Sequence, residues 1–532
     1  MTTFGIDLGT TFSCIARYDA EHKTIEVINN REGKNTTPSV VYVENGESIV
    51  VGETAINQLR GPKARQVVSF TKRLIANDML CESGEFNDYP AWKGERLTPV
   101  TTSAFILKKL SIDNPNVRNM IGDNKPKVVI TFPAYFTQSA RKRTQQAGEI
   151  AGLQVLGMIE EPIAAAISYG FGEKSSNETV LVYDLGGGTF DVTVVSFDGN
   201  GHGQVLAKEG DPQLGGVDWD NAFGYYIWEQ YAREYPQKIS LAMDDFRDSQ
   251  LSDLDKLRKV NAFRLLAQNA KHNLTNSEEY DVECDAEGNT VTVSRQDFDQ
   301  VTSELLQSTL SLTSEVLKGV NASISSVLLV GGSSLMPQVQ EGLERRFPQF
   351  QGKIRLEDPH QAVAKGAAIY AHSLDGKELG SGLPPTPPIR NIAAMSYGID
   401  CFINDVLRIS NIVAKKDPLP VTKKDYFTTR EENQRCIAFN IFEADTEKHD
   451  IGLDEGTKIS DRVEVHFERP VPKGTGIEVE FSINNDGLLK MTAKSMVDSG
   501  HVELTLQLKG VLTDAEVSAA AARMSATSVA KK

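Results

Sequence analysis

The chain has 532 residues, enough for roughly three or four domains. Its formal net charge of −16 excludes an overall basic surface of the kind that binds nucleic acid or an anionic membrane. Hydrophobic residues make up 40%, and the five scattered cysteines include no CxxC pair, which excludes zinc-ribbon and thioredoxin-type sites and fits a reducing cytoplasm.

The N-terminus enters a predicted strand at Phe4 without a basic segment or a long apolar core, so we expect no signal peptide. No apolar run approaches the ~20 residues of a membrane helix. We therefore expect a cytoplasmic protein that binds neither nucleic acid nor a membrane.

The first part of the chain, up to about residue 370, alternates strand-like and helix-like segments. The β-branched run at 126–136 is stopped by Pro133 and is followed by a predicted helix that ends near Gly152. Residues 180–197 predict a tight hairpin, and residues 325–347 predict a strand, a glycine turn and a helix. This alternation favours an α/β fold with buried sheets.

A stretch rich in proline and glycine at 375–390 predicts an extended, non-helical linker. Beyond it, short strand-like runs with turn signals, including the hairpin sequence NNDG at 484–487, predict an antiparallel β domain at 391–510. The remaining residues, 511–532, predict at most one short helix, which is marginal by itself.

Two related glycine-rich phrases follow strand-like runs, IDLGTTFS at 6–13 and DLGGGTFD at 184–191, and they suggest two similar halves. Backbone amides in tight glycine turns can converge on phosphate. A carboxylate beside such a turn is favourable when Mg²⁺ lies between it and the phosphate, so Asp7 and Asp184 are candidates to hold a hydrated Mg²⁺. The spacing alone leaves open a pair of ordinary β-hairpins, whereas the missing GxxxxGK[ST] pattern excludes a P-loop.

With both phrases present, the sequence resembles the Hsp70 family of ATP-dependent chaperones over residues 4–510. Further motifs that carry the resemblance are TKRLI at 71–75, PAYF at 133–136, EEPIAAAISYG at 160–170, QLGGVDWD at 213–220 and LLVGGSSLMP at 328–337. The resemblance implies a two-lobed, actin-like (RNase H-like) ATPase domain at 1–374, the linker, a β-sandwich peptide-binding domain at 391–510 and a short tail at 511–532. The family's helical lid would be essentially absent.

The resemblance also implies Mg-dependent hydrolysis of ATP to ADP and phosphate by a positioned water molecule. Residues matching the family's catalytic and metal-associated positions are Asp7, Lys72, Glu161, Asp184, Thr189 and Asp191. Residues matching its nucleotide-contacting positions are Gly9, Thr10, Thr11, Gly186, Gly187, Gly188, Thr189, Gly215, Gly216, Gln268, Lys271, His272, Thr275, Gly331, Gly332, Ser333 and Leu335. Without the resemblance, most of these would be ordinary turn glycines or surface residues.

Some of these positions depart from the family pattern. Gln268 stands at an acidic ribose contact, His272 at a commonly basic adenine-stacking position, and Leu335 at a position that is usually arginine. These changes leave the phosphate and metal chemistry intact and bear on the affinity for adenosine.

Communication between the domains is implied by Pro133 and Arg141, which match a family switch that reports the nucleotide state. The family's linker of three leucines and an aspartate is replaced here by PIRN at 388–391. Because Pro387 and Pro388 lack amide donors and Arg390 would occupy an apolar site, we expect the linker to resist docking on the ATPase lobes, so that ATP and peptide are weakly coupled.

In the β domain, the family's peptide groove matches Ile399, Phe402, Phe427 and Ile437, with Arg430 in place of a small residue at the arch. A plain β-sandwich core explains the apolar positions equally well.

The prediction is therefore an ATP-hydrolysing chaperone for extended apolar segments of unfolded or nascent chains, served by a J-domain co-chaperone and a nucleotide exchange factor. The alternative is a nucleotide-binding regulatory scaffold of the same fold. A filament-forming actin-like protein or a sugar kinase shares the phosphate hairpins, but the β domain and Lys72 argue against both.

Overall fold

The computed structural model of the chain describes residues 2–170, 177–198, 203–248, 251–356, 358–375, 389–460, 462–484, 487–498, 501–504, 508, 510–527 and 529.

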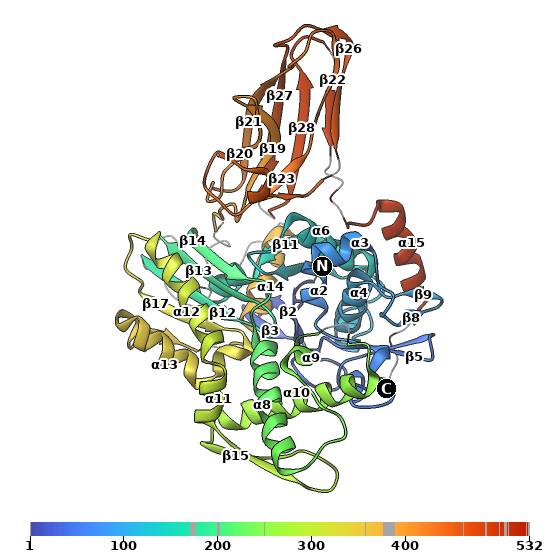
Figure 1. Cartoon of the computed structure of the whole chain (residues 1–532), viewed down its shortest axis with the longest axis vertical. Coiled ribbons are helices and arrows are strands. Elements are labelled where there is room, and N and C mark those ends of the chain that lie inside the picture. Colours follow the sequence, from blue (N-terminus) through green and yellow to red (C-terminus); the bar gives the residue numbers. More distant parts are fainter. Residues whose placement is uncertain are drawn as a thin grey trace.

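The N-terminal part of the chain forms two lobes, each built on one large mixed sheet (Figure 1). The first sheet contains β1 (Thr3–Asp7), β2 (Phe12–Asp19), β3 (Thr24–Val27), β4 (Thr37–Pro38), β10 (Lys127–Phe132) and β11 (Gln154–Glu160). The second contains β12 (Glu178–Leu185), β13 (Phe190–Phe197), β14 (Gly203–Asp211), β17 (Ser326–Val330) and β18 (Ile354–Arg355).

Both sheets share one topology. Three antiparallel strands, β1-β2-β3 or β12-β13-β14, form a meander. Two later strands, β10 and β11 or β17 and β18, then add in parallel beside the first strand of the meander. This repeat confirms the predicted two similar halves, and the predicted hairpin is the β12–β13 pair.

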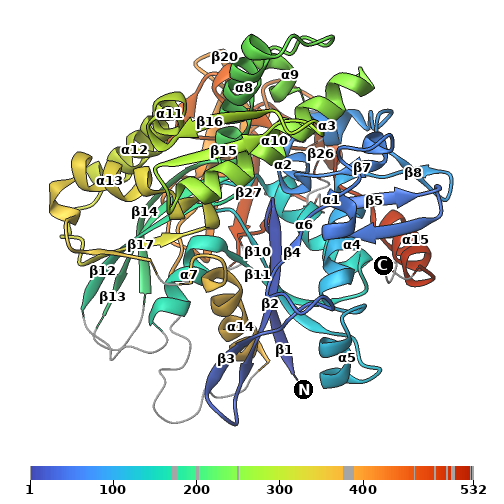
Figure 2. The same cartoon turned by 90° about the horizontal axis from the view of Figure 1, so that it is seen from below.

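Helices cover the sheets and join the lobes. Those packed around the first sheet are α1 (Glu53–Ile56), α2 (Thr71–Ala76), α3 (Asp78–Ser83), α4 (Pro99–Leu110), α5 (Pro115–Ile121) and α6 (Gln138–Ile150). Those of the second lobe are α8 (Gly216–Glu234), α9 (Met243–Arg247), α10 (Leu254–Leu274), α11 (Arg295–Val301), α12 (Ser303–Lys318) and α13 (Pro337–Arg346). Figure 2 shows α7 (Glu161–Gly170) and α14 (Ala362–Leu374) between the two sheets, where they pack against each other.

Small sheets complete the lobes. These are β5 (Val41–Glu44) with β6 (Ser48–Val51) and β7 (Val67–Val68), β8 (Ala91–Trp92) with β9 (Glu95–Arg96), and β15 (Glu279–Glu283) with β16 (Thr290–Ser294).

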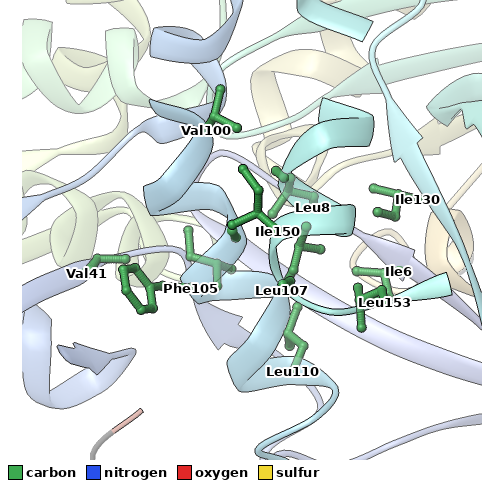
Figure 3. Close-up of a cluster of buried hydrophobic side chains, with 14 of the residues drawn as sticks. Ile6, Leu8, Val41, Val100, Phe105, Leu107, Leu110, Ile130, Ile150 and Leu153 are labelled. Atoms are coloured by element: carbon green, nitrogen blue, oxygen red, sulfur yellow. The ribbon is translucent and has the colours of Figure 1, made fainter. Parts of the chain in front are cut away.

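The core of the first lobe forms where α4 and α6 pack on the sheet (Figure 3). Ile6 and Ile130 come from adjacent parallel strands, Phe105 and Leu107 from α4, and Ile150 from α6, and none is more than 1% exposed. β10 is a nearly continuous apolar run, KVVITF, because helices cover both faces of the sheet.

The β domain is a sandwich with its own core, so the fold class predicted from the sequence is confirmed. One sheet contains β24 (Asp450–Ile451), β20 (Val406–Val413), β19 (Ser396–Ile403), β23 (Ile441–Ala444) and β25 (Thr457–Lys458). The other contains β21 (Val421–Thr428), β27 (Gly476–Ile483), β28 (Leu489–Ser495) and β29 (His501–Leu504), while β22 (Gln434–Phe439) pairs with β26 (Val463–Val471).

After the β domain, the chain returns to the first lobe as α15 (Asp514–Ser525), visible in red beside that lobe in Figure 1. Val517, Ala520 and Met524 join the apolar core of the lobe, and the amide of Gln146 on α6 exchanges two hydrogen bonds with the backbone of Leu512. Tertiary packing therefore stabilises a helix that is marginal in isolation. Among the helices of the described residues, none is long and apolar enough to span a membrane.

Candidate active site

The turns that follow β1 and β12 meet between the two lobes. A Cβ atom added at Gly187 would overlap the hydroxyl of Thr11, and one added at Gly188 would overlap the side chain of Thr10. Glycine is needed at both positions because the turn of one lobe lies directly against the turn of the other.

A cavity of about 450 Å³ lies beside these turns and is lined by both lobes. The predicted residues that line it are Asp7, Gly9, Thr10, Thr11, Lys72, Glu161, Asp184, Gly186, Gly187, Thr189, Gly216, Gln268, Lys271, His272, Thr275, Gly331, Gly332, Ser333 and Leu335. Three predicted residues lie behind this lining. Gly188 and Gly215 pack against each other, and Asp191 pairs with Asp184 across the β12–β13 hairpin.

The cavity also includes residues that sequence reasoning missed. They are Phe12, Cys14, Thr36, Asp220, Asn276, Met336, Pro359, His360 and Val363. Asp220 pairs with Lys271 at 2.7 Å between Oδ1 and Nζ, and 51 residues separate the two in the chain. The motif QLGGVDWD contains Asp220 but gives no signal for this partner.

One end of the cavity gathers several buried carboxylates around a single lysine. Lys72, from α2, forms an ion pair with Glu161, and both side chains are nearly fully buried. Burial raises the pKa of Asp7 to about 7, and repulsion from Glu161 adds to this effect. The same two causes raise the pKa of Asp191 to about 8 and hold the pKa of Asp184 well above its usual range.

Lys72 keeps its positive charge in this setting. Burial by itself lowers the pKa of the ammonium group, but the charges of Glu161, Asp7 and Asp184 raise it above its ordinary value. If all four carboxyl groups ionised, they would carry more negative charge than one lysine can balance, and this mutual repulsion contributes to the raised pKa values of the three aspartates.

This donor set fits a hydrated divalent cation, since hard oxygen ligands and excess negative charge suit Mg²⁺. Among the described residues, no three His, Cys, Asp or Glu side chains converge closely enough to hold a metal ion directly. Asp7 and Asp184 therefore suit Mg²⁺ that keeps its water ligands.

The remaining lining of the cavity is less charged. Lys271 pairs with Asp220, and His272 and His360 also line the cavity. Burial lowers the pKa of both histidines, and the charge of Lys271 lowers that of His272 further. Both imidazoles are therefore neutral at pH 7 and can stack on an aromatic base.

The tight contact between the turns gives a direct test. We expect Gly187→Ala to weaken nucleotide binding at least tenfold, because its methyl group would push Thr11 and the opposing lobe away. Gly319→Ala is the control, since Gly319 lies outside the cavity lining and its Cβ would lie 3.6 Å from the nearest atom, the carbonyl oxygen of Val316. Titration with a fluorescent ADP analogue measures both variants, and equal affinities would contradict the expectation.

Arg141 and the start of α6 connect this site to the β domain. Arg141 is 3% exposed, and its guanidinium donates to the carbonyl oxygens of Ala134 and Phe136, just after Pro133 at the end of β10. The same guanidinium donates to the carbonyl oxygen of Gly487 in the β domain at 3.4 Å. Arg141 therefore touches both domains, as a reporter of the nucleotide state would need to do.

Gln138, which sequence reasoning missed, reinforces this junction. Its amide donates to the carbonyl oxygen of Gly487 at 2.6 Å and to the hydroxyl of Tyr397 at 3.0 Å, and it accepts from the backbone of Leu489. A side chain that bonds 349 residues away leaves no local signal in the sequence.

The end of the linker corrects one expectation. Residues 376–388, which include Pro387 and Pro388, lie outside the described residues. Immediately after them, the backbone of Arg390 pairs with Gly203 and Val205 of β14, the edge strand of the second sheet. The linker therefore does pair with the lobe. The expected burial of Arg390 is also wrong, because its side chain is exposed.

In the β domain, the predicted groove residues occupy different environments. Ile399 is 2% exposed and belongs to the sandwich core, whereas Phe427 and Ile437 are partly buried against that core. Phe402 is 51% exposed, and the guanidinium of Arg430 lies 3.7 Å from the centre of its ring. Arg430 also pairs with Asp405 at 2.8 Å, so it bridges two neighbouring loops.

In a comparison with known protein families, the family model described as Hsp70 protein matches residues 3–532 of the chain.

Proposed function

Since the chain belongs to the Hsp70 family, whose members are chaperones with ATPase activity, we propose that it binds ATP between its two lobes and hydrolyses it to ADP and phosphate. The observation that carries this proposal is the buried Lys72–Glu161 pair among Asp7, Asp184 and Asp191, at one end of a cavity that also contains both glycine turns. A merely structural pocket has no need for this concentration of buried charge.

Different residues of the cavity have different proposed roles. Gly187 and the hydroxyl-bearing residues Thr10, Thr11 and Thr189 line the space that suits the phosphates, whereas the amide of Gly186 already donates to the carbonyl oxygen of Thr189. Mg²⁺, held through water by Asp7 and Asp184, would neutralise charge on the phosphate oxygens.

Hydrolysis then depends on three side chains. The ammonium group of Lys72 stabilises the negative charge that develops at the γ-phosphoryl group. Glu161, which lines the cavity, accepts a hydrogen bond from the attacking water molecule and orients it, while Asp191 acts from behind the lining through its electrostatic coupling to Asp184. Among the other residues that line the cavity, Gln268 and Lys271 suit the ribose, and His272 and Leu335 suit the base.

The β domain supplies the second half of the proposal, binding of extended apolar segments of unfolded or nascent chains. Its exposed apolar side chains near the β19–β20 turn suit such a ligand; they are Phe402, Val406 and Leu407. A J-domain co-chaperone and a nucleotide exchange factor are the expected partners. The compartment we propose is the cytoplasm.

A second candidate is a nucleotide-binding scaffold with little coupling between ATP and peptide. The observation that favours it is the attachment of the β domain, the segment at Arg390 and α15 to the ATPase lobes. A β domain held in place in this way would respond little to the nucleotide.

Measurement of ATP turnover with and without an unfolded apolar peptide, in Mg²⁺ and in EDTA, tests the proposal. Mg-dependent turnover that the peptide accelerates supports the chaperone. Nucleotide binding without such acceleration supports the scaffold. If nucleotide neither binds nor turns over, both are wrong.

We expect Asp184→Asn to reduce the maximal rate of Mg²⁺-dependent turnover and to raise the Mg²⁺ concentration required. The buried carboxylate is one of two that suit a hydrated cation, and the amide removes its charge while keeping its shape. Steady-state rates across a Mg²⁺ titration measure the effect. The role of Asp184 is wrong if the curves of variant and parent superimpose.

A further inference from the structure

Arg264 of the second lobe is held in a fixed orientation where the two lobes meet. Arg264, on α10, donates through Nε to Asn221 at 2.7 Å, through Nη1 to Asn261 at 3.1 Å and through Nη2 to the carbonyl oxygen of Phe246 at 2.9 Å. All three partners belong to the second lobe. The planar guanidinium is therefore a preorganised platform.

Phe70 of the first lobe packs on this platform, with its ring centre 5.5 Å from the guanidinium carbon. Phe70 immediately precedes α2 and has φ 56° and ψ 31°, in the left-handed region. This conformation is costly for an aromatic residue and persists only where the surroundings enforce it. The contact with Arg264 helps to hold Phe70 in this conformation.

The backbone at Phe70 sets the direction in which α2 begins. Two residues later, Lys72 reaches Glu161. The next residue, Arg73, crosses the cleft, donates to the carbonyl oxygen of Gly188 at 2.6 Å and forms an ion pair with Asp218. The ring of Phe70 therefore lies at the base of the short helix that presents both cations.

Two hydrogen bonds lie beside the stack and join the same two lobes. Asn261 donates to the carbonyl oxygen of Leu59, and Arg258 donates to that of Arg60, both at 3.2 Å. Farther along α10, Lys271 lines the cavity. One helix thus carries both the contacts to the first lobe and part of the cavity wall.

We propose that the stack of Arg264 on Phe70 positions Lys72 for hydrolysis and holds the lobes closed around bound nucleotide. Phe70 and Arg264 are positioning residues, since they act through α2 and through the distance between the lobes. The inference rests on the proposed function in so far as Lys72 acts on ATP.

Substitutions at Phe70 distinguish the effect of the aromatic ring from the effect of the left-handed backbone conformation. We expect Phe70→Leu to release a fluorescent ADP analogue about tenfold faster and to slow single-turnover hydrolysis about tenfold, whereas Phe70→Tyr keeps the ring and the parent rates. Phe70→Gly removes the cost of the left-handed conformation but also the ring, so it should behave like Phe70→Leu. Parent-like rates in Phe70→Leu or in Phe70→Gly would overturn the proposal.

Lys259→Met is the matched control. Lys259 also lies on α10, and its ammonium group stacks on Trp228 at 4.7 Å, but both residues belong to the second lobe. This variant should lose a cation–π contact and leave nucleotide release and hydrolysis unchanged. An equal effect of Lys259→Met would show that the rates respond to general loosening of α10, and the stack would have no specific role.

Hydrogen exchange of the α2 amides provides a readout that needs no nucleotide. Phe70→Leu should accelerate exchange over residues 71–76, and Lys259→Met should not. If the parent protein binds no ATP, the proposed function is wrong. Hydrogen exchange then still tests whether the stack of Arg264 on Phe70 orders α2. Equal exchange in Phe70→Leu and in the parent would overturn it.

Discussion

Replacement of Lys72 by alanine is expected to reduce single-turnover ATP hydrolysis by two to three orders of magnitude while ATP affinity stays within a few-fold of the parent. Lys72 is 5% exposed and charged, and it lies at the end of the cavity where the carboxylates converge. Loss of one preorganised charge contact to a transition state costs about 3–4 kcal/mol. Ground-state binding changes less, because the glycine turns and the threonine hydroxyls still contact the phosphates.

Lys109→Ala is the control for the loss of a buried lysine. Lys109 is 6% exposed and pairs with Glu32 at 2.8 Å in the same lobe, outside the cavity lining. This variant should lower the unfolding temperature and leave the single-turnover rate unchanged. An unchanged hydrolysis rate in Lys72→Ala would remove Lys72 from the mechanism.

Much of the ATPase fold was predictable because its signals are local. β10 and β12 contain apolar runs long enough for buried strands, and Pro133 marks the end of the first. The glycine phrases predicted two equivalent turns, and the structure shows the reason for their glycines in the contact of Gly187 with Thr11. These features depend on neighbours within a few residues or on an internal repeat.

The features that the sequence could not predict depend on partners far along the chain. Asp220 meets Lys271, and Gln138 meets Gly487, only after the lobes and the β domain have packed. The helix α15 is alanine-rich and capped by Thr513, but at 12 residues it is marginal alone, and the first-lobe core on which it docks lies outside any window of sequence around it.

The linker shows a different limit. The proline-rich composition of 384–388 argued against strand pairing, yet pairing with β14 involves Arg390, where the backbone has its amide. The composition of the whole segment therefore gave the wrong prediction for the residues at its end, Ile389 and Arg390, which contact the second lobe.

The contact between the β domain and the first lobe is expected to weaken as pH rises from about 5 to 8, because of Glu443. This residue, on β23, is 4% exposed, and burial raises its pKa to about 8, with a further contribution from the charge of Asp78. The backbone of Gln138 and the charges of Arg141 and Arg143 oppose the shift without abolishing it. Four groups of the first lobe therefore face Glu443, and it is buried by the docked arrangement.

The direction of the pH dependence follows from where Glu443 releases its proton. In the docked state it keeps the proton until about pH 8, whereas a solvated glutamate releases it near its ordinary value of 4.5. Between these values docking takes up one proton, so the docked state is fully favoured below about pH 4.5 and loses stability as pH approaches 8. The docking equilibrium constant should fall by up to about tenfold for each pH unit in this window.

Small-angle scattering of the full chain between pH 5 and 9 measures the effect, since separation of the domains extends the molecule. Glu443→Gln keeps the size of the side chain and removes its titration, so the variant should stay docked across the range. Asp445→Asn is the matched control, because Asp445 is 54% exposed and pairs with Lys415 at the same interface. It should weaken docking slightly and keep the pH dependence of the parent. A parent molecule whose dimensions do not change with pH, or a Glu443→Gln variant that opens in parallel with the parent, would show that Glu443 does not govern the contact.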